Sequence, residues 1–434
     1  MTTNLTPNRE DPVSAAPSQS DVAVVGIGPE DSSLSDSPTT LRGYFADRAR
    51  QIRGGESGML PVVGGLVLLT LIFQSQDSTF LHAGNLTNLL DQGATFILLG
   101  MAEVFVLLLG EIDLSIGFVA GIGATVTVEL SAPPHNLSWW WCCLAGLAVT
   151  TVIGFIQGSL ITRLGLPSFV VTLGGLLGFQ GVLLYLFDAD KYSTGGTIGL
   201  TNTVLVGIVN GNLSVTAGWI VTILVVALAA VAILRRDVTR RRSGVKTAPM
   251  SFTAIKLVFI AICGVGLVII CNTQRGIASS SVRGMPYVVL VVLAILAGWT
   301  FLLARTRLGR YIYAIGGNRE AARRAGINVV RVRTASFMLS GLTAGAAGIV
   351  YASRLGSIST GIDGGTLVLY AVAAAVIGGT SLFGGRGKMV HALLGGLVIA
   401  AIYNGMGLLG LGSAAQYMVT ALVLIAAVTI DALA

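Results

Sequence analysis

The residues best suited to chemistry in this sequence are three acids and a serine that lie within or next to long apolar runs. Glu103 lies inside the run 93–110, and Glu111, Asp113 and Ser115 follow in the segment GEIDLSIG. A carboxylate is costly in hydrocarbon, so an acid inside an apolar segment usually faces an interior path or a partner. We therefore take these four residues as candidate lining residues of such a path.

Structural roles for the same residues stay open. Glu103 could be an inward-facing acid that a neighbouring helix satisfies. Asp113, two residues before Ser115, also fits a helix N-terminus, where its side chain would accept free backbone N–H groups. A proton or sodium relay through Glu103 and Asp113 is a further alternative. A relay would require several mid-span acids, whereas only Glu103 lies mid-span.

No motif for ATP binding or covalent catalysis accompanies these acids. The nearest approach to the phosphate-binding loop G-x-x-x-x-G-K-[ST] is LFGGRGKM, which has Leu382 for the first glycine and Met389 after the lysine. The three histidines are scattered at His82, His135 and His391 without ligand spacing. We predict a protein that is not an enzyme, with no catalytic residue, no metal site and no cofactor of its own.

The composition shows what kind of element must position the acids. Of 434 residues, 53% are hydrophobic and 11% charged, whereas a soluble domain has about 25% charged residues. About twelve apolar runs are long enough to cross a bilayer, so we expect an all-α, polytopic helical membrane protein with lipid around it. The runs are 59–75, 93–110, 114–131, 139–162, 166–187, 217–234, 252–271, 286–304, 334–353, 366–383, 389–409 and 415–430.

Basic residues set the expected orientation of these spans. Of the 27 Lys and Arg, those that fall in outer segments are Lys191, Arg275, Arg283 and Arg354. Such a bias is the positive-inside pattern. It predicts that both termini are cytosolic. It makes 235–256 a basic cytosolic loop and 305–333 the longest basic cytosolic loop besides the N-terminal tail.

The first residues differ from the rest of the chain. Residues 1–55 are rich in Ser, Pro, Asp and Thr and show no hydrophobic periodicity. Such a segment cannot bury enough apolar surface to order itself. We predict a disordered cytosolic tail over 1–55 and a membrane domain over 56–434.

A short polar helix stands out in the loop 305–333, in GGNREAARRAGINV. Asn318 is a good N-cap, Glu320 can pair with Arg324 four residues on, Arg323 suits the last turn, and Gly326 suits the stop. Three alanines give the predicted helix a small, smooth face: Ala321, Ala322 and Ala325.

A helix of two turns is marginal in isolation. One with such clear start and stop signals is expected to dock on something, and its place in a cytosolic loop favours a cytosolic protein partner. The alternative is an interfacial helix that rests on anionic lipid headgroups.

Two stretches of the chain echo one another. LLLGEIDLSIGFVAG and VIGGTSLFGGRGKMVHALLGG both run from an apolar span through a glycine-containing polar hinge into a second span. Both hinges lie on the inner side in the predicted topology. Many transporters are built from two related halves, and this echo hints at the same construction here.

Several stretches together resemble one family. YAIGGNREAARRAGINV resembles the cytoplasmic coupling loop of the monosaccharide permeases of ATP-binding-cassette importers, the ribose/xylose group. EIDLSIG is similar to that family's Gly-Ile-Asp-Leu-Ser-Val-Gly hinge, and GLPSFVVTLG, SRLGS and VIGGTSLFGGRG resemble later signatures in the same order. The resemblance runs over roughly 85–430.

The resemblance implies that this chain works with other subunits that have separate roles. Two permease copies, a homodimer here, pair with two cytosolic ATPase subunits that bind ATP and Mg, and an extracytoplasmic binding protein delivers sugar across a bacterial plasma membrane. No nucleic acid is involved. The helix 316–326 would then seat in the ATPase, through Gly316, Gly317, Asn318, Glu320, Ala321, Ala322, Arg323, Ala325 and Gly326.

Departures from the family pattern bear on the substrate. Glu111 stands where a glycine is usual, and Tyr370 stands where ribose-type members often carry an acid. The spans 217–234 and 252–271 resemble an extra pair of the longer xylose-type permeases. These features favour xylose over ribose. Two alternatives stay open. One is an ion-coupled secondary transporter, and the other is a related importer for branched-chain amino acids or a signalling sugar.

Overall fold

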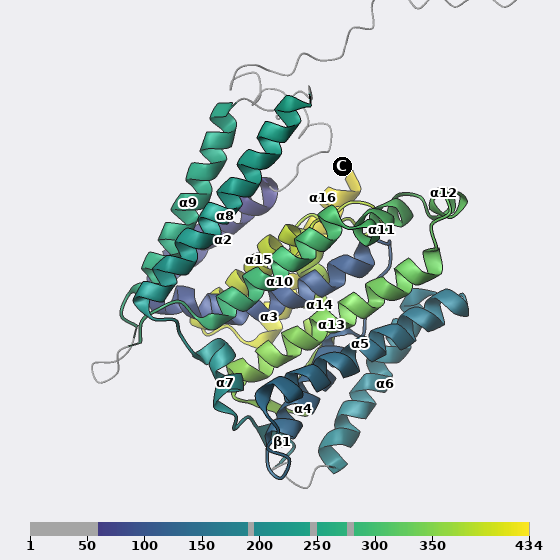
Figure 1. Cartoon of the computed structure of the whole chain (residues 1–434). Coiled ribbons are helices and arrows are strands. Elements are labelled where there is room, and N and C mark those ends of the chain that lie inside the picture. The colour runs from purple at the N-terminus through teal and green to yellow at the C-terminus, as the bar shows by residue number, and fades with distance from the viewer. Residues whose placement is uncertain (1–59, 190–194, 244–249, 276–281, 434) are drawn as a thin grey trace, which may run out of the picture.

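Long apolar helices form nearly all of the protein in this computed structural model (Figure 1). The structure describes residues 60–189, 195–243, 250–275 and 282–433. The predicted tail 1–55, Lys191 and part of the basic loop 235–256 therefore lie at least partly outside the described residues. The long helices are α2 (Leu60–Gln76), α3 (Ala83–Leu107), α4 (Ile116–Ser131), α5 (Trp139–Arg163), α6 (Ser168–Ala189), α8 (Val215–Arg242), α9 (Met250–Asn272), α10 (Tyr287–Arg305), α13 (Val329–Leu355), α14 (Gly364–Ile377), α15 (Met389–Leu408) and α16 (Ser413–Leu433).

Each predicted span falls on one of these helices, so the all-α polytopic prediction is confirmed. Within the described part of the chain, 8 helices are long and apolar enough to cross a membrane, and α2, α4, α14 and α16 supply shorter apolar stretches. Several boundaries were wrong. The helix α8 runs on to Arg242 rather than 234, so part of the predicted loop 235–256 is helical, and α13 begins at Val329 rather than 334. The helix α3 begins at Ala83 rather than 93, and α14 ends at Ile377 rather than 383. The first turns of α3 are polar, which hides them from a hydropathy count, and Gly379 ends α14 with φ at 105°.

The helices α3 and α13 form the centre of the bundle. The apolar stretch of α3 is 89% buried, the highest share among the long spans. The helix α13 lies beside α5 (Figure 1) because glycines remove the side chains between them. A Cβ on Gly341 would overlap the carbonyl oxygen of Thr150, and one on Gly154 would overlap that of Phe337. Small residues allow this close approach of helix backbones in lipid.

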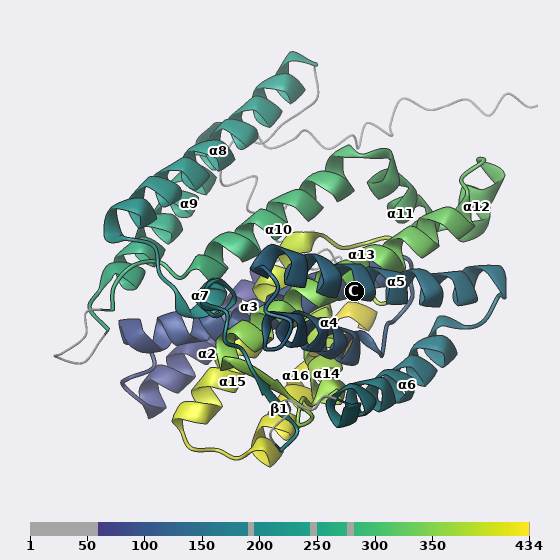
Figure 2. The same cartoon turned by 60° about the horizontal axis from the view of Figure 1, so that its bottom comes forward.

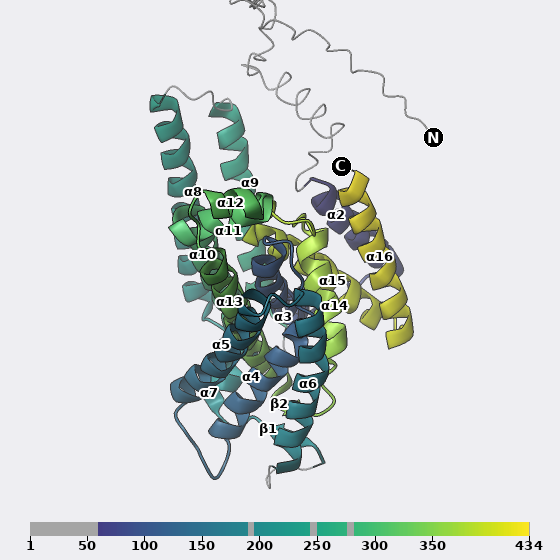
Figure 3. The ribbon, with the colours of Figure 1, turned by 90° about the vertical axis from the view of Figure 1, so that its right-hand side faces the viewer.

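One end of the bundle carries small elements that the hydropathy pattern did not reveal. The strand β1 (Thr197–Gly199) pairs antiparallel with β2 (Ser357–Ser359), in the register Thr197↔Ser359. The short helix α7 (Thr203–Asn210) follows β1, and Asn210 Nδ2 donates to the Ser353 carbonyl at 2.6 Å. The β pair lies at the end of the bundle away from the polar helix α12 (Arg319–Arg324) (Figure 3).

The helices α8 and α9 form a hairpin that stands beside the bundle rather than inside it (Figures 1 and 2). The apolar stretch of each is only 11% buried. Within the hairpin, Thr253 Oγ1 donates to Asp237 Oδ2 at 2.5 Å. Large apolar side chains such as Ile223 and Ile262, each 64% exposed, face outward. In a bilayer such a surface is in contact with lipid.

Figures 1 and 3 show which described elements lie at each end of the bundle. The far tip of the α8–α9 hairpin, α12 and the last turns of α16 lie toward one end, and β1 lies toward the other. The polar helix α12 and the end of the C-terminal helix α16 therefore lie on the same side of the bundle.

Candidate functional site

The polar helix α12 has the caps that its sequence predicts. Asn318 Oδ1 accepts the Ala321 N–H at 2.8 Å, and Gly326 ends the turn with φ at 80°. Glu320 Oε1 accepts Arg324 Nε at 3.3 Å and Arg323 Nη2 at 2.9 Å. The N-cap, the i,i+4 pair and the glycine stop are confirmed.

Two expectations about this helix were wrong. It spans Arg319–Arg324 rather than 316–326, because Gly316 and Gly317 end the preceding helix. Ala322 does not belong to an outward face. It is 5% exposed and packs in the core of its own chain, whereas Ala321 and Ala325 are exposed. A helix of 3.6 residues per turn must turn one face to its own bundle, and the sequence did not show which.

The helix α11 (Arg307–Gly317) carries α12 and was not predicted as a helix. Thr306 Oγ1 caps it by accepting the Gly309 N–H at 3.2 Å. Ile312 and Ile315 are buried, and the hydroxyl of Tyr313 donates to the Gly387 carbonyl at 2.8 Å. Burial raises the pKa of the Tyr313 phenol. The i,i+3 spacing of the two isoleucines was the signal that could have revealed α11.

The end of α11 rests on the two predicted hinges where they meet. The N–H of Gly385, in the second hinge, donates to the carbonyl of Leu108, in the first, at 2.9 Å. A Cβ on Gly316 would overlap the Leu108 carbonyl, and one on Gly384 would touch the Gly110 backbone. We call these five residues the glycine crossing. The two stretches that echo one another in the sequence are thus in direct contact, directly beneath α11.

The acids of the first hinge are bonded to the hinge itself. Glu103 Oε1 accepts the Asp113 N–H at 3.1 Å, and Asp113 Oδ1 accepts the N–H and hydroxyl of Ser115 at 2.9 and 2.6 Å. Gln157 Nε2 donates to Ser115 Oγ at 2.7 Å. All four side chains are buried. This network holds the bend between α3 and α4. The role of Glu103, Asp113 and Ser115 in a substrate path stays a prediction.

Glu111 forms a buried ion pair with a residue far along the chain. Its Oε1 atom accepts both Nε and Nη2 of Arg333, and the two side chains are only 9% and 6% exposed. Arg333 lies in the first turns of α13, directly after α12. Burial, followed by the neighbouring Arg333 charge, lowers the pKa of Arg319 on α12, and Glu111 opposes that effect. Sequence analysis missed Arg333 because 222 residues separate it from Glu111.

The exposed helix α12 therefore reaches the first hinge by two routes. One runs through α11 and the glycine crossing. The other runs through the start of α13 and the ion pair Arg333–Glu111. Because packed elements shift as units rather than deform continuously, we expect a displacement of α12 to reach the bend between α3 and α4 through these contacts.

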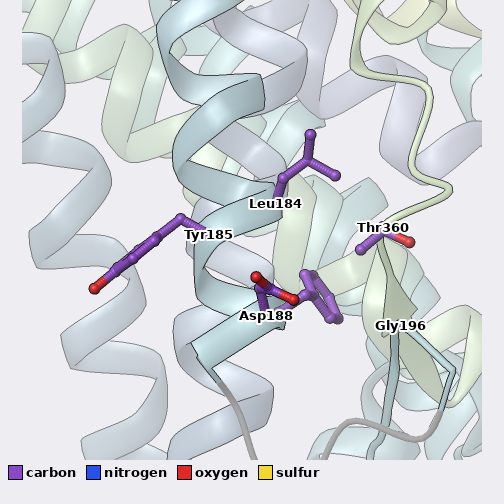
Figure 4. Close-up of a pocket in the computed structure, with 6 residues that line it drawn as sticks. Leu184, Tyr185, Asp188, Gly196 and Thr360 are labelled. Atoms are coloured by element: carbon purple, nitrogen blue, oxygen red, sulfur yellow. The ribbon is translucent and has the colours of Figure 1, made fainter.

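A cavity of about 370 Å³ opens at the opposite end of the bundle (Figure 4). In Figure 4 Asp188 points into the space between the end of α6 and the chain at Gly196 and Thr360, whereas Tyr185 points away from it. This rim combines a carboxylate with a hydroxyl at the surface farthest from α12. Its lining residues are Leu184, Tyr185, Phe187, Asp188, Gly196 and Thr360.

Comparison with known proteins identifies the type of chain. A family model described as "Branched-chain amino acid transport system / permease component" matches residues 85–428. The xylose transport system permease protein XylH of Escherichia coli (strain K12) is 33% identical over 398 residues, which cover 87% of this chain and 94% of XylH.

Two further relatives from the same organism match over most of their length. The D-allose transport system permease protein AlsC is 30% identical over 369 residues, 85% of this chain and 90% of AlsC. The ribose import permease protein RbsC is 29% identical over 367 residues, 84% of this chain and 91% of RbsC. No solved structure matches the chain. The chain belongs to this family of transport-system permease components, and it is a multi-pass transport subunit of the plasma membrane rather than an enzyme.

Proposed function

We propose that this chain is the permease of an ATP-binding-cassette importer that carries a monosaccharide, with D-xylose favoured. The observation that carries the proposal is the 33% identity to XylH over nearly the whole of both chains. The α8–α9 hairpin agrees with it, since the sequence suggests this pair by resemblance to the longer xylose-type permeases. Transport of a branched-chain amino acid is the second candidate, because the description of the family model names that substrate.

The energy source in this proposal is a separate cytosolic ATPase that binds ATP and Mg. The sequence contains no phosphate-binding loop, and α12 offers an exposed, capped helix at one end of the bundle. Arg323 and Arg324 on it are 71% and 80% exposed in their side chains. In this proposal the end that carries α12 and the last turns of α16 faces the cytosol. An extracytoplasmic binding protein then meets the opposite end, near β1 and β2, and a second copy completes the permease.

The test is uptake by the complete assembly in vesicles. We expect the permease, co-expressed with its ATPase and binding protein, to accumulate radiolabelled D-xylose more rapidly than D-allose, D-ribose or leucine. Uptake should stop when the ATPase is inactivated and continue when a protonophore collapses the proton gradient while ATP is maintained. Uptake that fails on adding the protonophore would favour the ion-coupled alternative, and faster uptake of leucine would favour the amino acid.

Docking of the ATPase on α12 is tested with Ala321→Asp. Ala321 is exposed, and an acid in the first turn suits the helix dipole, so α12 itself should persist. A charge desolvated in the docking contact costs several kcal/mol, and each 1.4 kcal/mol is about a tenfold loss of affinity. We expect normal membrane levels, loss of ATPase co-purification and loss of uptake.

Arg323→Gln is the milder control at the same helix, since its side chain lies largely in solvent. Wild-type ATPase stoichiometry and transport in Ala321→Asp would mean that α12 is a lipid-surface helix instead.

A further inference from the structure

Four tyrosines from four different helices meet near the end of the bundle opposite α12. Tyr370 of α14 and Tyr403 of α15 lie with ring centroids 6.3 Å apart in an edge-to-face arrangement. Phe96 of α3 contacts both, at 5.1 and 5.6 Å. Tyr351 of α13 and Tyr417 of α16 complete the group.

Two side-chain contacts join α14 to α16 beside these rings, and one of them involves a carboxylate. The Tyr417 hydroxyl donates to Asp363 Oδ2 at 3.3 Å. Asp363 caps α14, its Oδ1 accepting the Thr366 N–H at 3.0 Å, and the side chains of Tyr370 and Thr420 of α16 are hydrogen-bonded. We call Tyr351, Tyr370, Tyr403, Tyr417 and Asp363 the tyrosine vestibule.

An aromatic belt at the lipid interface is the ordinary explanation for tyrosines near helix ends. Belt residues stand singly on the outer surface, whereas here the rings converge. Tyr370 is 4% exposed, and Tyr351 and Tyr403 are half-buried between helices. Only Tyr417, at 46%, is open. The vestibule is therefore part of the bundle interior, with one ring at its entrance.

The hydroxyls of the vestibule also indicate water rather than lipid. In the part of the chain that the structure describes, the hydroxyls of Tyr351 and Tyr403 have no hydrogen-bond partner, and neither oxygen is enclosed by protein. An unpartnered hydroxyl in hydrocarbon costs several kcal/mol. The same groups cost little where they face a water-filled space, which is what a transport path provides.

The chemistry of the vestibule fits one class of ligand. Aromatic faces carry negative potential and pack against the C–H groups of a sugar ring, while phenol hydroxyls and a carboxylate hydrogen-bond sugar hydroxyls. The carboxylate of Asp363 disfavours anions such as sugar phosphates. We propose that the tyrosine vestibule binds an uncharged monosaccharide as it enters the permease. The inference rests on the proposed function and adds the residues that recognise the substrate.

The first test measures D-xylose uptake by the complete assembly containing Tyr403→Leu or Tyr403→Phe. The leucine variant removes the aromatic face, and we expect at least a tenfold loss of uptake, which corresponds to about 1.4 kcal/mol. The phenylalanine variant keeps the face and should retain most of the rate. Tyr287→Leu, on α10 and outside the vestibule, is the control for the loss of a tyrosine ring elsewhere in the chain.

The outcomes separate the two proposals. A wild-type assembly that takes up no sugar would overturn the proposed function. A wild-type assembly that transports, with Tyr403→Leu transporting equally well, would overturn the vestibule alone. A loss in Tyr403→Leu that Tyr287→Leu shares would also count against it.

The second test does not depend on transport. Cysteine is placed at Tyr417 or at Ile269 after the four native cysteines are replaced by alanine. Ile269 is 54% exposed near the same end of α9 and faces lipid. An impermeant methanethiosulfonate reagent needs a thiolate in water, so Tyr417→Cys should react and Ile269→Cys should not. D-xylose at saturation should slow the reaction. Equal inertness of the two cysteines, or labelling that sugar does not slow, would contradict the inference.

Discussion

Gly316→Ala is expected to destabilise the permease and nearly abolish uptake. The added methyl group would overlap the Leu108 carbonyl and crowd the Gly385 N–H, and both are backbone atoms that cannot rotate away. Overpacking in a well-packed region costs ~1–3 kcal/mol. Relief of the overlap must separate α11 from the two hinges, which breaks the route from α12 to the bend between α3 and α4. Melting temperature in detergent and uptake in vesicles measure the two effects.

The neighbouring glycine provides a matched control. A Cβ on Gly317 would meet nothing within 4 Å. Gly317→Ala should therefore leave uptake unchanged and raise stability by up to ~1 kcal/mol, because alanine is the better helix former. If Gly316→Ala were as stable and as active as Gly317→Ala, the glycine crossing would not be a close contact in the working protein.

Arg333→Leu is expected to have the second large effect. It leaves the Glu111 carboxylate buried without its partner, and removal of one member of a buried ion pair typically costs ~3–5 kcal/mol. The double variant Glu111→Leu with Arg333→Leu removes both charges and should recover most of the lost stability, since an apolar pair can replace a buried ion pair at little cost. The melting temperatures of the wild-type protein, Arg333→Leu and the double variant measure these differences in stability.

The exposed pairs of α12 provide the comparison for this prediction. Glu320→Gln removes the partner of Arg323 and Arg324, whose side chains lie largely in solvent, and should change stability by less than ~1 kcal/mol. A double variant with a lower melting temperature than Arg333→Leu would contradict the ion-pair account. A double variant that is stable but cannot transport would show that the charges serve coupling as well as folding.

Hydropathy predicted the helices because burial in lipid requires long apolar runs with internally satisfied backbones. Residue type at single positions predicted the caps of α12, since Asn318 and Gly326 act on backbone groups within a few residues. Local signals of this kind survive in the sequence. The start of α3 was misplaced because a contact between distant segments makes its polar first turn acceptable in the bundle: Asn85 Nδ2 donates to Asn404 Oδ1 on α15 at 2.8 Å.

Contacts between distant segments could not be predicted. The partner of Glu111 lies 222 residues away, and nothing in GEIDLSIG indicates an arginine on α13. The burial of Ala322 depends on how α12 leans on the bundle, which no pattern in REAARR encodes. The tyrosine vestibule joins four helices whose individual tyrosines each resemble ordinary interfacial residues in the sequence.

The α8–α9 hairpin begins and ends at one point of the molecule. Leu213 N–H donates to the Met285 carbonyl at 2.8 Å, and Tyr287 N–H donates to the Gly211 carbonyl at 3.1 Å. The chain thus leaves the body and returns to it across a single bridge between Asn212 and Pro286. We expect that such a segment could be excised and the cut ends joined through a short turn without rerouting any other helix, at the loss of its side contacts with α3, such as Arg275 to Thr87. The hairpin is accordingly a natural place to graft a foreign segment, such as an affinity handle or a fluorescent reporter, into an otherwise intact permease.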